Sequence, residues 1–354
     1  MQEFITHGNA IVGTMTKLYV QEPISGGIFL SYKCTNECKH CMYACSPRWK
    51  DDWISERDVE KILTQLSGRV LGSPFGNDKI GVNYGVHFTG GEPFLNFDLL
   101  LKVTQIAHDL GIPSTFVETN SFWCTNDEVT REKLVQLKEA GLHGILISVN
   151  PFILEQLPFE RTERAVRIGG EVFRENAIIY QGFFYSQFRS LNIKDALPFK
   201  EYLQKIDLSD LYENVELLPL GRATYMLDHL YRKYPAKRFF GESCSQELTR
   251  GWHVHIDNYC NYITGYCGGI SLGDGRNIDS ICEGINLDER PILKALSTDL
   301  KELFHLGIGE FDYKEREEGY ISKCHLCVDI RKHIAQKTDE FKELRPREFY
   351  YRLE

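Results

Sequence analysis

The sequence of 354 residues lacks an excess of basic residues, a long apolar run and any repeat at a fixed period. Its formal net charge of −9 argues against a protein held mainly by nucleic-acid phosphates, because such a protein needs a basic face. No segment approaches the roughly 18 consecutive apolar residues of a membrane span, and the first 13 residues do not have the pattern of a signal peptide. We therefore expect a cytoplasmic protein without a membrane or nucleic-acid partner.

Cysteine, by contrast, is abundant. In a reducing cytosol, eleven cysteines indicate metal or redox chemistry more often than disulfides. Four lie in one short loop and six in the last third, whereas the long middle holds a single one, so the distribution predicts two metal sites. The eleven are Cys34, Cys38, Cys41, Cys45, Cys124, Cys244, Cys260, Cys267, Cys282, Cys324 and Cys327.

Short apolar runs alternate with helical patterns through the first two-thirds of the chain. The expected strands are 27–32, 86–89, 115–118, 144–149, 178–180 and 215–218. The expected helices are 56–66 with Ser55 as N-cap, 99–110, 127–140, 160–173, 199–206 and 224–234. Six such units in a row predict a parallel sheet with helices packed outside, curled into a partial (β/α)6 TIM-like barrel. The active site of such a barrel lies at the C-terminal ends of the strands.

The pattern changes after Pro235. A β-hairpin is expected over 253–264 with its turn near 258–261, followed by helices at 291–306 and 324–337. We therefore divide this α/β chain into an N-terminal extension at 1–25, a barrel at 26–235 and a small C-terminal α+β domain at 236–354.

The first cysteine group has the spacing C-x3-C-x2-C, formed by Cys34, Cys38 and Cys41. A short loop of this kind can place three thiolates round one face of a 4Fe-4S cluster, and three ligands leave one iron open. The alternative is a zinc site that adds Cys45 as a fourth ligand, because structural zinc prefers four closed ligands.

The next expected strand ends in Thr89-Gly90-Gly91-Glu92-Pro93. A three-cysteine loop followed one β/α unit later by Gly-Gly-Glu-Pro resembles the radical S-adenosylmethionine (SAM) superfamily, and the resemblance covers most of 26–235. His40 departs from it, since an aromatic residue usually precedes the third cysteine. The resemblance implies that SAM binds the open iron and is cleaved reductively to a 5′-deoxyadenosyl radical, which takes hydrogen from a substrate. It also implies a reducing partner such as ferredoxin or flavodoxin.

The resemblance further implies residues that bind SAM. Gly90 and Gly91 would let the backbone approach the methionine part of SAM, and Glu92 would accept a hydrogen bond from the amino group of SAM. The other implied contacts are Asn120, Ser148 and Asn150 at later strand ends, and Arg222 beside the adenine. Ser121 stands where the family's Thr-Asn-Gly segment has glycine. Alternatives remain open: Glu92 as a solvated loop carboxylate, Ser148 and Asn150 as turn formers or helix caps, and Arg222 as a surface residue.

The C-terminal cysteines resemble the auxiliary-cluster domain called Twitch, a shortened relative of the SPASM domain. The resemblance implies one auxiliary 4Fe-4S cluster on Cys244, Cys267, Cys324 and Cys327. The interval from Cys244 to Cys267 is longer than usual, so Cys260 or Cys282 could replace a ligand. A structural zinc site is the alternative. Cys260, in the expected hairpin turn, is also a candidate hydrogen-atom donor to a substrate radical.

These features predict a radical SAM enzyme whose auxiliary cluster assists oxidation or substrate binding. Only 33 residues precede Cys34, too few for a peptide-recognition domain, which favours a small-molecule substrate over a peptide. The alternatives are an activase that makes a glycyl radical on a partner protein, a two-cluster electron carrier, and a zinc-stabilised binding module. The Gly-Gly-Glu segment argues against the carrier, which needs no SAM site.

Overall fold

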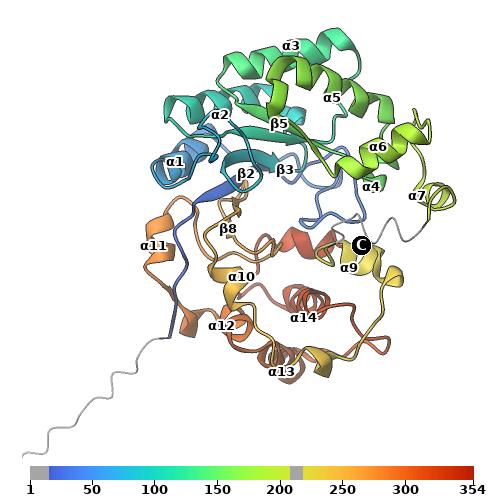
Figure 1. Cartoon of the computed structure of the whole chain (residues 1–354). Helices are drawn as coiled ribbons and strands as arrows, with labels where there is room; N and C mark the ends of the chain where they lie inside the picture. The colour runs from blue at the N-terminus through green and yellow to red at the C-terminus, as the bar shows by residue number, and fades with distance from the viewer. Residues whose placement is uncertain (1–15, 208–217) are drawn as a thin grey trace, which may run out of the picture.

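The computed structural model describes residues 16–207 and 218–354. Its centre is a seven-stranded sheet with the order β6-β5-β4-β3-β2-β7-β8, in which every neighbouring pair is parallel except β7 and β8 (Figure 1). The strands are β2 (Ser25–Ser31), β3 (Gly85–Gly90), β4 (Phe116–Thr119), β5 (Gly144–Ser148), β6 (Ala177–Tyr180), β7 (Val254–Ile256) and β8 (Tyr262–Ile263). This mostly parallel sheet confirms the expected α/β class.

Helices cover one face of the sheet (Figure 1). They are α1 (Glu56–Leu66), α2 (Phe97–Asp109), α3 (Asp127–Glu139) and α5 (Phe159–Phe173), with the shorter α4 (Pro151–Leu154), α6 (Gly182–Ser190) and α7 (Phe199–Tyr202) near the β6 edge. Helix α1 shows why the sequence forms helices here. Ser55 caps α1 by accepting a hydrogen bond from the Asp58 backbone, and the helix buries its apolar stripe against the sheet.

Five expected barrel strands are confirmed. The sixth, 215–218, lies outside the described residues apart from Leu218. The helix expected at 199–206 is shortened to α7. The helix expected at 224–234 is also shorter than predicted and is replaced by α9 (Ala223–Met226) and the 3-10 turn η3 (Asp228–Leu230). After η3 the chain becomes extended, and Tyr234 pairs with Tyr320.

The predicted hairpin is confirmed, and it belongs to the central seven-stranded sheet. Strand β7 lies beside β2 in parallel register, with Gly27 opposite His255, and β8 folds back against β7 with Ile263 opposite His255. The last third of the chain thus supplies two strands to this sheet, with β7 next to β2 on the side away from β3.

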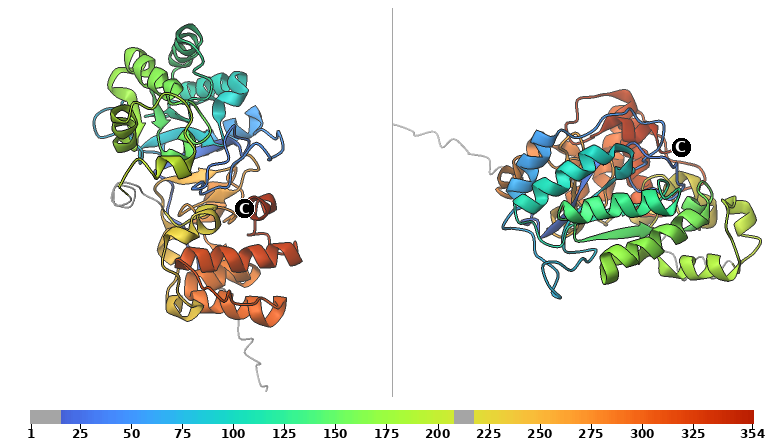
Figure 2. Two further views of the ribbon diagram at one scale, coloured as in Figure 1. Left: turned by 90° about the vertical axis from the view of Figure 1, so that its right-hand side faces the viewer. Right: turned by 90° about the horizontal axis from the view of Figure 1, so that it is seen from above.

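Helices of the last third form a second layer below the sheet (Figure 2). They are α10 (Ser245–Thr249), α11 (Ile278–Cys282), α12 (Pro291–Thr298), α13 (Leu300–Phe311) and α14 (Lys323–Lys337). The single helix expected at 291–306 is wrong, because Asp299 adopts an extended conformation and caps α13 through the Lys301 backbone. The helix expected at 324–337 is confirmed as α14.

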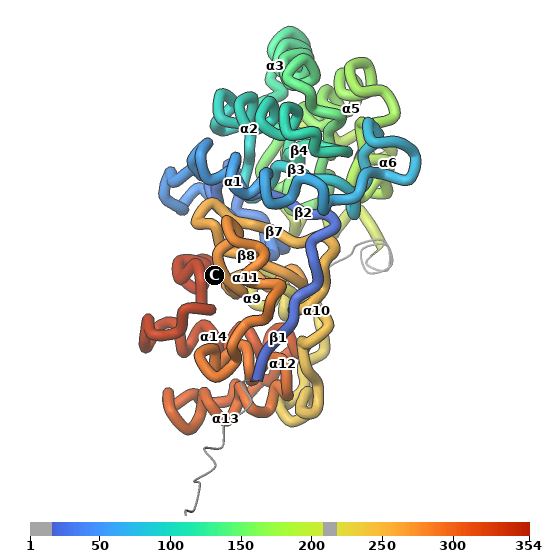
Figure 3. The backbone as a smooth tube through the Cα atoms, turned by 90° about the vertical axis from the view of Figure 1, so that its left-hand side faces the viewer, coloured from blue at the N-terminus to red at the C-terminus, as the bar shows by residue number. Residues whose placement is uncertain are grey.

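The N-terminal segment runs along this layer (Figure 3). Strand β1 (Lys17–Leu18) pairs antiparallel with β9 (Ile285–Asn286). The remaining short 3-10 turns are η1 (Pro93–Asn96), η2 (Arg174–Asn176), η4 (Ala236–Phe239), η5 (Leu287–Glu289) and η6 (Arg347–Tyr351). Within the described residues, no helix combines the length and apolar character that crossing a membrane requires.

Candidate active site

The three-cysteine loop begins directly after β2, at the C-terminal edge of the parallel sheet. The Cys34 backbone donates to the Ser46 carbonyl at 3.2 Å, which closes the loop on itself, and the Cys41 backbone donates to the Cys38 carbonyl at 3.1 Å. The Asn36 backbone donates to Cys34 Sγ at 3.4 Å. All three cysteines are partly buried, so the loop presents its thiols in a protected position.

Gly90 and Gly91 hold the end of β3 against this loop. The Gly91 backbone donates to the Ser31 carbonyl at 2.8 Å, and the Glu92 backbone donates to the Lys33 carbonyl at 2.9 Å. A Cβ atom on Gly91 would lie 1.9 Å from the Lys33 carbonyl oxygen, and one on Gly90, whose φ is +109°, would lie 2.4 Å from that of Ser31. Both positions therefore require glycine for packing against the cysteine loop, and their contact with SAM stays a prediction.

Glu92 is not the solvated carboxylate of the alternative, since only 1% of it is exposed. Its Oε1 accepts from the Phe94 backbone at 3.2 Å and from Thr119 Oγ1 at 2.9 Å, and its Oε2 accepts from the Asn120 backbone at 2.8 Å. Burial raises the pKa of Glu92 to about 7, and these three donors oppose the rise. Glu92 thereby links the ends of β3 and β4 just behind the cysteine loop.

Asn120 reaches the first thiol of the loop. Its Nδ2 donates to Thr35 Oγ1 at 3.0 Å and lies 3.7 Å from Cys34 Sγ. Ser121 adopts a positive φ of 69°, which explains why a glycine is the usual residue at this position. Asn120 thus lies close to a sulfur of the three-cysteine loop.

Asn150 caps α4, as one of the alternatives stated. Its Oδ1 accepts from the backbones of Phe152 and Ile153, both at 3.1 Å, while its Nδ2 lies 3.3 Å from His40 Nε2. The His40 ring stacks on Phe152 with centroids 4.8 Å apart, so the histidine packs in the way an aromatic ring would. Ser148 is half-buried at the end of β5, opposite Tyr180.

Arg222 is buried, with 1% of its surface exposed, so the alternative of a surface residue is wrong, and its contact with the adenine of SAM stays a prediction. Its backbone donates to the Cys41 carbonyl at 3.1 Å. Its guanidinium donates to the carbonyls of Cys38 at 2.9 Å, Ala44 at 2.8 Å and Cys45 at 3.1 Å. Burial raises the pKa of the Cys38 thiol to about 12, and the charge of Arg222 opposes this rise. The arginine therefore fixes the shape of the cysteine loop and stabilises negative charge on it.

Replacing Arg222 by leucine is expected to destabilise the fold and lower the iron content after reconstitution. Each buried carbonyl left unpaired costs about 1–3 kcal/mol. Arg48→Leu is the matched control, because Arg48 belongs to the same loop but makes an exposed ion pair with Glu37, worth at most about 1 kcal/mol. Urea unfolding and iron analysis of both variants test this. Equal stability of the two would contradict the role assigned to Arg222.

The structure brings the four predicted auxiliary ligands together. Cys244 precedes α10, Cys267 follows β8, and Cys324 and Cys327 lie in the first turns of α14. Burial raises the pKa of Cys244, and the charges of the other three thiolates raise it further. Arg331, one turn beyond Cys327 and buried, donates from Nε to Cys327 Sγ at 3.2 Å. The positively charged side chain of Arg331 therefore faces this group of thiols.

Cys260 and Cys282 lie elsewhere. Burial raises the pKa of the Cys260 thiol to about 11, and the charged groups around it are Arg276, Asp58, Asp274 and Asp257. Those around Cys282 are Arg69, Glu22 and Asp279. The largest charge effects on both thiols come from arginine, aspartate and glutamate side chains and not from the cysteines of the C-terminal group, which favours the original four as a set.

The spacing of the sulfurs bears on which metal group fits. In the described part of the chain, no three cysteine sulfurs lie within 4.8 Å of one another. A tetrahedral zinc ion with Zn–S bonds of about 2.3 Å would hold its sulfurs roughly 3.8 Å apart. The described cysteines therefore form no ready-made shell for a single zinc ion, and the 4Fe-4S assignment of both groups stays a prediction.

A histidine group, His87, His253 and His255, was missed in the sequence. It is the one set of three His, Cys, Asp or Glu ligand atoms in the described residues within 4.8 Å of one another. The signal was present, because His253 and His255 alternate along an expected strand and so point to one face. Nothing local indicated that His87 would face them.

Comparison with known proteins agrees with the geometry. Residues 28–167 match the family model of the radical SAM superfamily. GTP 3′,8-cyclase of Aquifex aeolicus (strain VF5) is 30% identical over 205 residues, which are 52% of this chain and 58% of the cyclase. The chain thus spans less than two thirds of that curated relative.

Three solved structures also align with this chain. BtrN in complex with AdoMet and 2-DOIA has 13% identity and a TM-score of 0.38, covering 78% of this chain and 88% of BtrN. Native anSMEcpe with bound AdoMet has 11% identity and a TM-score of 0.43, covering 88% and 97%. SuiB of Streptococcus suis bound to S-adenosylmethionine has 16% identity and a TM-score of 0.39, covering 90% and 76%.

The family match and the similarity to the cyclase support an enzyme of the radical SAM class. That family implies a 4Fe-4S cluster and SAM as cofactors.

Proposed function

We propose that this enzyme binds a 4Fe-4S cluster through Cys34, Cys38 and Cys41 and uses it with SAM to oxidise or rearrange a small molecule. The observation that carries the proposal is the packing of the three-cysteine loop on Gly90 and Gly91 at the C-terminal edge of the parallel sheet. When bound, the cluster supplies the electron that cleaves SAM into methionine and a 5′-deoxyadenosyl radical. The chain's own residues shape the site in which this happens.

Three side chains do most of that shaping. Arg222 fixes the loop through its carbonyls, and Asn120 places an amide donor near Cys34 Sγ. Glu92 holds the β3 and β4 ends together, which sets the position of Asn120. Fixed dipoles and hydrogen bonds of this kind position a cofactor without reorganisation during the reaction.

The substrate space is proposed to lie between the two cysteine groups. Tyr43, two residues after the third cysteine of the loop, is buried, and burial raises its pKa. The charged or ionisable groups that act on Tyr43 are Tyr266, Cys267, Arg250 and Glu118. Residues of the cysteine loop, of β4 and of the C-terminal cysteine group therefore lie close enough to act on one buried side chain, and we propose that the substrate binds near it. Its buried position favours a small molecule, and a peptide is the alternative.

We further propose that Cys244, Cys267, Cys324 and Cys327 hold an auxiliary 4Fe-4S cluster that accepts an electron from the substrate or helps to bind it. The convergence of the four thiols supports this, and so does Arg331, whose charge would offset that of bound thiolates. A reducing protein such as ferredoxin or flavodoxin is the proposed source of electrons for the first cluster.

Anaerobic reconstitution with iron and sulfide tests both sites. We expect about eight irons per chain, four per cluster, and release of 5′-deoxyadenosine after addition of SAM and dithionite. Iron binding without SAM cleavage would instead indicate an electron carrier. An iron count near four, with zinc bound, would remove the auxiliary cluster and leave the first site in place.

A further inference from the structure

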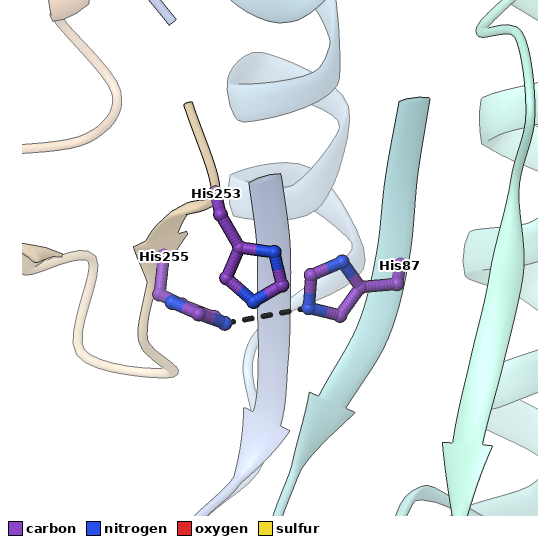
Figure 4. A group of neighbouring side chains, drawn as sticks. All are labelled: His87, His253 and His255. Atoms are coloured by element: carbon purple, nitrogen blue, oxygen red, sulfur yellow. Dashed lines mark hydrogen bonds between the residues drawn. The ribbon is translucent and has the colours of Figure 1, made fainter. Parts of the chain in front are cut away.

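Three buried histidines face one another across β2 (Figure 4). His87 comes from β3, His255 from β7, and His253 from the residue before β7. Nε2 of His87 and Nε2 of His255 are 3.3 Å apart, and one ring nitrogen from each of the three lies within 4.8 Å of the others. Residues from distant parts of the chain thus place three imidazoles around one point.

The strand register makes room for this group. Gly27 of β2 lies opposite His87 on one side and His255 on the other. A Cβ atom at Gly27 would lie 2.4 Å from His87 Nε2 and 2.7 Å from His255 Cδ2. Glycine at this position therefore allows the two rings to meet above the strand, which any other residue would prevent.

The three histidines lie on the sheet face turned away from the outer helices. Ile145 of β5 contacts α5 at Gly169, and through the register Ile145 shares its face with Val117 and Phe88. Because side chains alternate along a strand, His87 points to the opposite, inner face. The group therefore borders the interior region in which the substrate is proposed to bind.

Hydrogen bonds at the outer nitrogens orient two of the rings. His253 Nδ1 lies 2.9 Å from the Val82 carbonyl, which only accepts, so Nδ1 carries the proton and Nε2 keeps its lone pair. His255 Nδ1 lies 3.0 Å from the hydroxyl of Tyr43, whose oxygen can accept in the same way. Such outer partners are typical of histidines that bind a metal through the other nitrogen.

Charge at this position also suits a cation. All three rings are buried, and burial disfavours the charged form of a histidine, so each offers a neutral imidazole, the form that binds metals. Glu118 Oε1 lies 3.7 Å from His87 Nε2, while Thr89 donates to Glu118 Oε2 at 2.6 Å. Arg250 is a positive charge near His253 and lowers its pKa, whereas the negative charge of Glu118 raises it.

We infer that His87, His253 and His255 bind one divalent transition-metal ion of the zinc type, with a further coordination position open beside Glu118. Imidazole is a preferred ligand of such ions. With metal–nitrogen bonds of about 2.0–2.1 Å, two ligands of a tetrahedral ion lie roughly 3.3 Å apart, which matches the separation of the His87 and His255 nitrogens. Three histidines with an open position form a site that can hold a water or a substrate oxygen.

The test uses the full chain after iron–sulfur reconstitution, so that iron occupies the cysteines. Zn²⁺ is added, excess is removed by desalting, and bound zinc is measured with its X-ray absorption spectrum. Zinc also displaces any Fe²⁺ held by imidazoles, because its affinity for such ligands is higher. We expect about one zinc per chain, with nitrogen or oxygen neighbours near 2.0–2.1 Å and no sulfur.

The variant His253→Asn should lose at least about tenfold in zinc affinity, since one of three ligands is gone. Asparagine tolerates the positive φ of 50° at this position, which protects the fold. His305→Gln, on the exposed face of α13, is the control and should bind zinc like the wild type. His255→Gln is the second variant if circular dichroism shows that His253→Asn is unfolded.

Zinc absent from the wild type, or bound equally by folded variants, would overturn the inference. So would sulfur neighbours near 2.3 Å, which would place the zinc on cysteines. Iron content is measured in the same samples. A failure of iron loading therefore counts against the proposed clusters, and the zinc result stands separately from it.

Discussion

Replacing Cys34, Cys38 and Cys41 together with alanine is expected to reduce release of 5′-deoxyadenosine from SAM to background and to remove about four irons per chain. The reason is that the three thiolates are the proposed protein ligands of the first cluster, and no iron remains to bind SAM without them. The measurement is chromatographic detection of 5′-deoxyadenosine after reconstitution and reduction with dithionite. Iron at the C-terminal group should persist, because its four cysteines are untouched.

Cys45→Ala is the control that distinguishes a three-ligand cluster from a four-cysteine zinc site. Cys45 is buried in the same loop, and its hydrogen bond to Cys41 is the largest cause that lowers the pKa of the Cys41 thiol, to about 6. A three-ligand cluster should survive the loss of Cys45, with reduced efficiency at most. If Cys45→Ala loses as much metal as the triple variant, the loop holds a four-cysteine site instead, as the zinc alternative supposed. Continued SAM cleavage by the triple variant would contradict the site assignment itself.

The Cys324→Ala/Cys327→Ala variant is expected to lose about four irons, half the total, and to keep part of its reductive SAM cleavage. The first cluster keeps its three ligands, and the electron that cleaves SAM enters there. Turnover of the true substrate should be lost, whether the auxiliary cluster takes up an electron or lines the substrate space. Iron analysis and the same 5′-deoxyadenosine assay measure these two effects.

Cys260→Ala/Cys282→Ala is the matched control, because it also removes two cysteines from the last third of the chain. Both thiols lie among other charged groups, so this variant should retain about eight irons. Circular dichroism is measured first to show that the variant is folded, since a small region stabilised by a bound metal can unfold when the metal is lost. A folded Cys324→Ala/Cys327→Ala variant with unchanged iron would show that neither residue is a ligand.

The elements that could be predicted from the sequence are those with a strong local signal. Strands β2 to β6 and helices α1 to α3 follow from hydrophobic periodicity and from caps such as Ser55. The two cysteine groups followed from spacing and family resemblance. The break at Asp299 was missed because apolar residues continue on both sides of it, so the period gave no warning.

Features that depend on contacts between distant segments could not be predicted in this way. Arg222 reads as an ordinary charged residue at the start of a helix, and only the fold shows that the loop carbonyls surround it. The glycine at 91 suggested room for a ligand, whereas the nearest neighbour is the Lys33 carbonyl. The facing of His87 and His255 depends on β7 joining β2, a pairing between segments more than 220 residues apart.

That pairing also has a consequence for how the chain reaches its folded state. One edge of β2 is complete only when β7 arrives, so it stays unpaired while the intervening residues are synthesised. At about 5–20 residues per second this interval lasts roughly 10–45 s. An exposed strand edge is a site for pairing with other chains, and Gly26 and Gly27 provide few side chains to prevent it. We expect newly made chains to depend on chaperones during this interval, and truncation before residue 254 to yield aggregates instead of an isolated barrel.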